Sequence, residues 1–192
     1  MKFSGGEARE QEHTQRGEQY GGTVERGYPD TLVLKRLDPM MTQVRAPGPG
    51  PIRKRDWEPL AKRWLEGKEV VLHTDGARTY QMKIDKVLHD NVVHKMTKKT
   101  INGKAVWLRP KYVKLFKHKI SGVRQVLKVK GGTQIIDGFW KGLHSQIKHV
   151  RRAPGNAAMT RKVRSAQWAY WNMDKDLWLE TGKMCKDLHL KR

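Results

Sequence analysis

The stretch KEVVLHTDGARTY, residues 68–80, decides the fold class. Its first half, EVVLH (69–73), is short, apolar and β-branched, which predicts a buried strand. The strand leads to Asp75 and Gly76, and a carboxylate held at the end of a buried strand beside a glycine is fixed in position and approachable by a ligand. Because Asp-Gly is also a common turn dipeptide, a purely structural role for Asp75 stays open.

A second stretch, TQIIDGFWKGLHSQIK (133–148), carries another carboxylate. Its apolar residues recur at helical spacing, which predicts an amphipathic helix over residues 134–150. The side expected to pack on a sheet consists of Ile136, Phe139, Trp140, Leu143, Ile147 and Val150. The adjoining side carries Gln134, Asp137, Lys141, His144 and Lys148. Such a row can hold a cation through its carboxylate and phosphate through its Lys and His; the alternative is an ordinary solvated face with an Asp137–Lys141 ion pair.

The charge of the chain is the third observation. Nineteen Lys or Arg residues and one acid, Asp137, lie between residues 91 and 167, and the net charge is +21 with a pI near 10.3. This one-signed excess predicts a polyanionic partner, DNA or RNA. Aromatic side chains lie among the cations, an arrangement that suits backbone contact together with base stacking. The candidate nucleic-acid contacts are Lys111, Lys114, Lys141, Lys148, Arg151 and Arg152.

Strands and helices in succession predict an α/β architecture. We expect a strand at 31–37, a helix capped by Asp56 and ended by Gly67, and a helix at 157–173. Residues 77–88 are expected to form a short helix and residues 90–97 a strand. The predicted organisation is a disordered polar segment at 1–22, one domain at 23–173 with a basic loop or insertion at 98–132, and a mixed-charge tail at 174–192.

Composition excludes several classes. The single Cys185 rules out an internal disulfide and a cysteine-rich zinc site. No apolar run approaches the roughly 20 residues of a membrane span, and residues 1–19 lack the apolar centre of a secretory signal. There is no glycine-rich phosphate loop and no G-x-S-x-G elbow. We therefore expect an intracellular protein that lies with the chromosomal DNA.

Several blocks together resemble one family. VERGYPDTLVL (24–34), VVLHTDGARTY (70–80), His89 and His94, and GTQIIDGFWKGLHSQIK (132–148) resemble successive blocks of the ISXO2-like insertion-sequence DDE transposases, from about Gly21 to Trp171. The resemblance implies an RNase H-like fold, a mixed sheet flanked by helices. It also implies strand cleavage and transfer on DNA with two divalent metals, Mg²⁺ or Mn²⁺, by a protein that can act as a homo-oligomer on the element ends.

The same resemblance suggests roles for individual residues. Asp75 matches the second catalytic aspartate, and Asp137 and Gln134 occupy the block of the third acid, where the family commonly has Glu and Asn. His144 stands where the family has Lys. The first aspartate is expected on a strand before the VERG block, and residues 1–23 contain no Asp. The chain thus resembles an N-terminally truncated or decayed domain in which Asp75 and Asp137 are the expected metal ligands.

These observations predict a transposase-derived DNA-binding domain of the DDE class that lacks its first catalytic aspartate. The alternatives are a non-enzymatic nucleic-acid-binding protein that uses the same basic surface and a ribosome-associated basic protein. Only the first requires Asp75 and Asp137 to lie close enough to share a metal.

Overall fold

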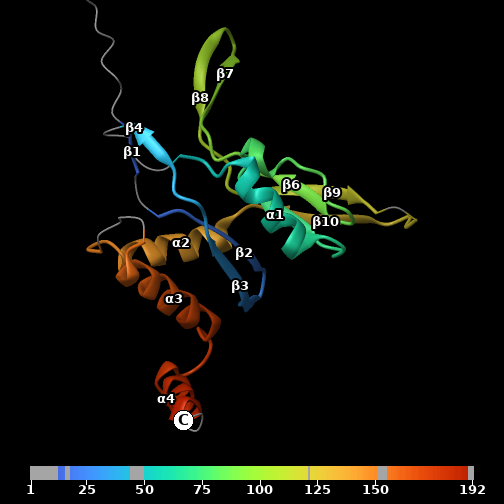
Figure 1. Cartoon of the computed structure of the whole chain (residues 1–192). Coiled ribbons are helices and arrows are strands. Elements are labelled where there is room, and N and C mark those ends of the chain that lie inside the picture. The colour runs from blue at the N-terminus through green and yellow to red at the C-terminus, as the bar shows by residue number, and fades with distance from the viewer. Residues whose placement is uncertain (1–12, 16–17, 44–49, 121, 151–154, 190–192) are drawn as a thin grey trace, which may run out of the picture.

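The computed structural model describes residues 13–15, 18–43, 50–120, 122–150 and 155–189. In these ranges the chain forms a mixed α/β structure with five two-stranded sheets and four α-helices. The expected α/β class is therefore confirmed, while the strands are grouped in pairs and do not form one continuous sheet (Figure 1).

The centre of the molecule is an antiparallel hairpin with helices on both faces (Figure 1). It consists of β2 (Tyr20–Glu25) and β3 (Tyr28–Arg36), joined at Gly27, whose φ of 83° suits the tight turn. Leu32 and Leu34 are buried on one face, and Leu37, beyond the end of β3, is buried on the other. Val33 and Lys35, which alternate with Leu32 and Leu34, are exposed, so β3 shows the period-2 pattern of a strand buried on one face.

Helices α2 (Gln134–Gln146) and α3 (Ala157–Trp171) cover the face of Leu32 and Leu34. The buried residues of this core are Leu32, Leu34, Phe139, Leu143, Met159, Val163 and Ala166. Polar contacts also fix α3 to the hairpin, because the Gln167 amide and the Trp171 indole donate to the carbonyl oxygen of Leu32 at 3.0 and 2.8 Å. The predicted apolar face of the 134–150 helix is thus confirmed.

Helix α1 (Lys54–Leu65) lies near the start of β2 on the other side, where a Cβ on Gly21 would be 3.4 Å from Leu60. Leu37, Trp57, Leu60 and Ala61 form a second core there. The helix ends as predicted at Gly67, whose φ is 75°. Its predicted cap is wrong. Arg53 is the N-cap residue, and Asp56 lies inside the first turn, where its carboxylate pairs with the Arg53 guanidinium.

Strand β5 (Val71–Thr74) confirms the predicted strand and pairs in parallel with β6 (Leu88–Asn91). The short helix expected at 77–88 is wrong, because only the 3₁₀ turn η1 (Arg78–Tyr80) forms there. The strand expected at 90–97 is misplaced as well: β6 ends at Asn91, and the next strand begins at Thr97.

Residues 98–132 are not a loop. They contain most of two antiparallel ribbons, β7 (Thr97–Ile101) with β8 (Lys104–Leu108), and β9 (Lys114–Lys119) with β10 (Val126–Gly131). Both ribbons project from the body in different directions (Figure 1). The turn of the first is Asn102-Gly103, both at positive φ, as a tight hairpin turn requires.

The ends of the described chain also differ from the predicted boundaries. Residues 20–22 already belong to β2, and β1 (His13–Gln15) pairs with β4 (Met41–Gln43). The remainder of the segment predicted to be disordered lies largely outside the described residues. The predicted mixed-charge tail contains a helix, α4 (Leu177–His189), which lies apart from the central hairpin (Figure 1). No helix in the described ranges is both long and apolar enough to cross a membrane.

Candidate functional site

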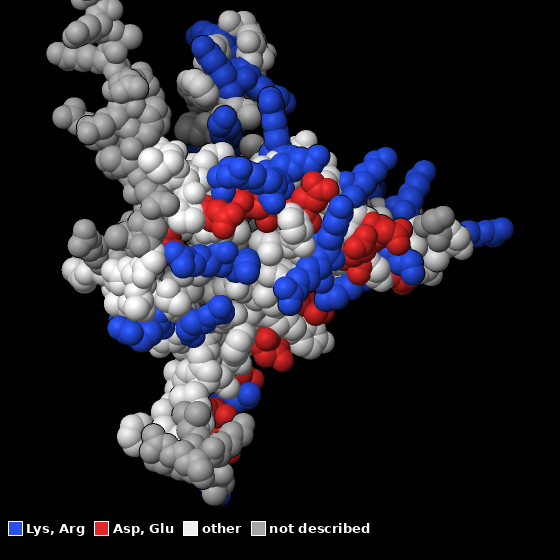
Figure 2. All heavy atoms as spheres, in the orientation of Figure 1, with Lys and Arg blue, Asp and Glu red and all other residues white. Residues whose placement is uncertain are grey.

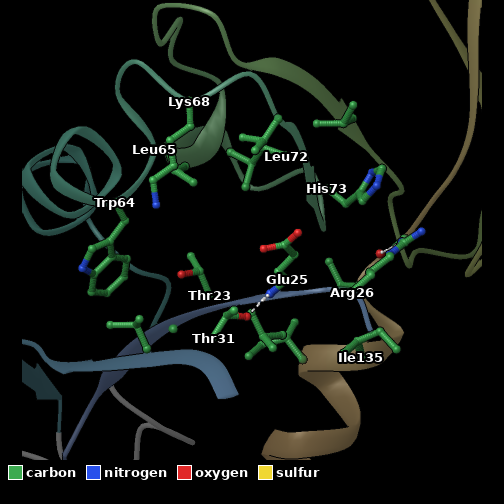
Figure 3. A pocket seen from close by; sticks show the side chains of 18 residues that line it. Thr23, Glu25, Arg26, Thr31, Trp64, Leu65, Lys68, Leu72, His73 and Ile135 are labelled. Atoms are coloured by element: carbon green, nitrogen blue, oxygen red, sulfur yellow. Dashed lines mark hydrogen bonds between the residues drawn. The ribbon is translucent and has the colours of Figure 1, made fainter. Parts of the chain in front are cut away.

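A groove of about 560 Å³ separates the central hairpin from β5 (Figure 3). Its walls come from five elements: β2, β3, the end of α1, β5 and the start of α2. Trp64 and Leu65 stand on the α1 side, Leu72 and His73 on the β5 side, and Ile135 on the α2 side. The groove therefore lies between the two stretches, 68–80 and 133–148, that carry the predicted acids.

Two strand edges that pair with no other strand in the described part of the chain line this groove. On β5, the carbonyls of Val70 and Thr74 accept from Leu88 and Val92 at 2.9 and 3.0 Å, so their backbone groups face β6. Because backbone groups alternate sides along a strand, those of Val71 and His73 face away from β6. On β2, the carbonyl of Gln19 accepts from the N–H of Leu37 at 2.8 Å, so the backbone groups of Gln19 face β3. By the same alternation, the backbone groups of Gly22 face away from β3. Gly22, Val71 and His73 all line the groove.

Glu25 and Arg26, at the end of β2 and the turn that follows, supply charge to the groove (Figure 3). The Glu25 carboxylate points between β2 and β5, and its backbone N–H is held by the Thr31 hydroxyl at 2.9 Å. Arg26 donates to the carbonyls of Lys130 and Gly132, the latter at 2.7 Å, and so connects the hairpin to β10 and α2. From the sequence, Glu25 and Glu18 are acids that could take the place of the missing aspartate if the chain cleaves DNA, whereas Arg26 has no predicted role.

Asp75 follows β5 directly and is exposed, as predicted. Its Oδ1 accepts from the backbone N–H of Ala77 at 3.0 Å, an Asx turn that fixes the carboxylate. Gly76 adopts a φ of 84°, and a Cβ there would lie 2.8 Å from Val93, so the turn requires glycine. Burial, followed by the charge of Asp75, raises the pKa of Tyr80 to about 12.

The polar row of α2 is exposed as predicted, and it includes Gln134, Asp137, Lys141 and His144. The Asp137 carboxylate accepts a hydrogen bond at 2.7 Å from the hydroxyl of Thr133, the N-cap residue of α2. The Asp137–Lys141 ion pair is absent from the ion pairs seen among the described residues. Gln134 donates to the carbonyl of Tyr112, so its amide helps to connect α2 to the segment before β9.

The described residues do not fit a complete two-metal site. Thr133, beside α2, and His73, on β5, border the same groove, whereas Asp75 and Asp137 are not among the residues that line it. Within the described ranges no group of three or more His, Cys, Asp or Glu side chains is placed to hold a metal ion. The predicted Mg²⁺ or Mn²⁺ site therefore stays a prediction for Asp75 and Asp137, and no catalytic step follows from it.

A buried ionic cluster lies behind β5. The Asp90 side chain is only 1% exposed, and its two oxygens meet His73 Nδ1 at 2.6 Å and His118 Nε2 at 3.1 Å. These contacts join β5, β6 and β9. His73 is thus a histidine with a hydrogen-bonding partner. Beside it, His89 Nε2 lies 2.9 Å from the Thr74 hydroxyl, and burial lowers the pKa of His89.

The predicted nucleic-acid contacts are spread over several elements. Lys141 and Lys148 are exposed on and just beyond α2, and Lys111 and Lys114 are exposed at the base of the second ribbon. Arg151 and Arg152 lie outside the described residues. On the face that Figure 2 shows, Lys and Arg side chains extend from both projecting ribbons.

Glu18 differs from Glu25 in its surroundings. Its side chain is 2% exposed, pairs with Arg36 and accepts from the Gly155 backbone N–H at 2.6 Å. It therefore connects the hairpin to the segment before α3, whereas Glu25 faces the groove.

Comparison with known proteins found no matching family model, no matching curated protein and no matching solved structure.

Proposed function

We propose that this chain is a DNA-binding domain derived from a DDE transposase, with an RNase H-like fold and an incomplete metal site. The supporting observation is the groove between the open edges of β2 and β5. One further strand in that groove would join β3, β2, β5 and β6 into a single five-stranded sheet of mixed direction. Such a sheet is what the resemblance to the ISXO2-like transposases implies.

The position of the groove also suits the missing acid. The family's first aspartate is expected on a strand before the VERG block, which is residues 24–27 here. Val24, Glu25 and Arg26 of this block border the groove. Residues 1–23 contain no Asp that could supply that carboxylate. The chain would then bind DNA through its basic surface but would not cleave it efficiently, because a two-metal reaction needs ligands that fix both ions.

The test is an assay of the purified 192-residue chain on supercoiled plasmid and on short duplexes, with Mg²⁺ or Mn²⁺ present. We expect binding that weakens steeply with salt and no efficient cleavage. Failure to bind duplex DNA would overturn the proposal, and a marked preference for structured RNA would favour the ribosome-associated alternative. Sedimentation with and without DNA tests whether the chain forms a homo-oligomer on the duplex, which is part of the proposal.

Two variants separate decay from an altered active site. Glu25→Gln removes the carboxylate that faces the groove, and Glu18→Gln removes one that is already paired with Arg36. Cleavage by the unmodified chain that disappears in both Asp75→Ala and Glu25→Gln would show that Glu25 has replaced the missing acid. That result would contradict the incomplete-site part of the proposal while leaving DNA binding intact.

A further inference from the structure

The ribbon formed by β9 and β10 has two different faces. Strand alternation places Lys114, Phe116, His118, Leu127, Val129 and Gly131 on the inner face. Phe116, His118, Val129 and Gly131 are buried or half-buried, whereas Lys114 and Leu127 are exposed. The outer face carries Leu115, Lys117, Lys119, Val126, Lys128 and Lys130, and all six are exposed. Four of the six outer side chains are therefore lysines, and no acid lies on either strand.

The inner face fixes the ribbon to the body. The His118 ring reaches the buried Asp90 carboxylate, and Phe116 stacks on His118 with ring centroids 6.3 Å apart. Gly131 lets the chain approach closely, because a Cβ there would lie 2.5 Å from both Asp90 and Phe116. An isolated two-stranded hairpin is marginal in water, so these contacts at the base hold the outer face in a defined position.

The outer face includes an arrangement that is unfavourable for folding. Lys117 lies directly opposite Lys128 in the register, and like charges placed directly across a strand pair are destabilising. Among the described ion pairs none includes Lys117, Lys119, Lys128 or Lys130. Dissolved salt screens this repulsion, and a polyanion lying along the ribbon would neutralise it.

We infer that the outer face of the β9–β10 ribbon, defined by Lys117, Lys119, Lys128 and Lys130, is a binding surface for the phosphate backbone of duplex DNA. Charge complementarity carries the assignment, since four exposed ammonium groups on a projecting two-stranded ribbon match a polyanion. A ribbon of this width also fits the major groove of B-DNA. The inference rests on the proposed function only in taking DNA as the polyanion, and it concerns lysines outside the groove.

The experiment measures duplex affinity against salt for a variant with all four lysines changed to Gln. Each phosphate contact contributes about 0.9 to the slope of log K against log salt, so loss of four contacts lowers the slope by about 3 to 4. Affinity should fall alike on duplexes of different sequence, because phosphate contacts carry no base information. Changing the same four lysines to Arg should restore the slope.

A second set of four cations supplies the matched control. Arg161, Lys162, Lys175 and Lys186 are exposed on α3, before α4 and on α4, and their change to Gln lowers the net charge equally. A slope that falls no more in the ribbon variant than in this control overturns the inference while leaving the proposed function standing. Unmodified protein that binds no duplex overturns both. Preference for polyglutamate over duplex DNA at equal charge would show that the ribbon binds acidic polypeptides instead.

Discussion

The change of Asp90 to Asn tests whether the buried ionic cluster holds the second ribbon to the body. Asp90 accepts from His73 Nδ1 at 2.6 Å through one oxygen and contacts His118 Nε2 at 3.1 Å through the other. Asn keeps the shape but replaces one oxygen with an NH₂ group. One ring nitrogen then faces a donor, and the remaining contact loses its charge.

The expected loss of stability follows from these two contacts. Hydrogen bonds to charged groups contribute about 1.5–3 kcal/mol each, and breaking a buried pair on one side costs about 3–5 kcal/mol. Because Asn retains one acceptor, we expect the free energy of unfolding to fall by about 2–4 kcal/mol. Urea unfolding followed by far-UV circular dichroism measures it.

The control is Asp85→Asn, which removes an exposed carboxylate from the loop before β6 and should change stability by less than about 0.5 kcal/mol. A double-mutant cycle with His118→Gln isolates the contact across to the ribbon, and a coupling energy of about 0.5 kcal/mol or more is expected. If Asp90→Asn costs less than about 1 kcal/mol, or shows no coupling to His118, the cluster does not hold the ribbon and the reasoning is wrong.

Three further predictions concern single side chains. Asn156→Ala should lower stability by about 1 kcal/mol in thermal unfolding, because the Asn156 side chain caps α3 by accepting from the backbone N–H of Ala158 at 2.9 Å. Gly22→Ala should lower the free energy of unfolding by about 1–3 kcal/mol, since the added Cβ would lie 2.8 Å from Leu34. Gly21→Ala is its control and should lower it clearly less, because its Cβ would approach nothing closer than 3.4 Å. Burial lowers the pKa of His89 below its usual 6.5, so the stability of the unmodified chain falls as pH drops through 6.5 toward the folded-state pKa. His89→Gln should remove this pH-dependent loss of stability, as measured by urea titrations at several pH values.

The elements predicted best are those whose apolar residues face one core. Both faces of helix α2 were predicted correctly, because Phe139 and Leu143 recur at helical spacing and pack on the hairpin. Its predicted end at residue 150 was wrong, since the helix ends at Gln146. Strand β5 was predicted from a short apolar run, and the end of α1 from Gly67. In each case local pattern and tertiary packing agree.

The segment after β5 was predicted wrongly because one periodicity was mistaken for another. Tyr80, Met82 and Ile84 all pack against the α1 core, at a spacing of two residues. That spacing belongs to extended chain and not to a helix.

The two ribbons were missed because neither strand pair buries a complete face. Along β7, Lys98 and Lys99 are both exposed, so the apolar alternation that marks a half-buried strand does not develop. The Asn-Gly turn at 102–103 was the one local signal of a hairpin.

Only the part of the candidate site that depends on residues close together in the sequence was predicted. Asp75 was located at the end of its strand from five preceding residues. The Asp90–His118 contact spans 28 positions, and the approach of Glu25 to β5 spans more than 40, so no local pattern contains either. Such contacts depend on how the elements pack, which neither periodicity nor spacing specifies.

The open edges of β2 and β5 also affect the behaviour of the protein at high concentration. Unpaired strand edges are templates on which a second copy can add, and native proteins commonly block them with charge. Here the net charge of +21 keeps copies apart. Salt shortens the range of that repulsion to about 10 Å at 0.1 M, and bound DNA neutralises it outright. Colloidal stability is therefore greatest in dilute salt without nucleic acid, and saturation with short duplexes lowers solubility at the same time as it occupies the basic surface.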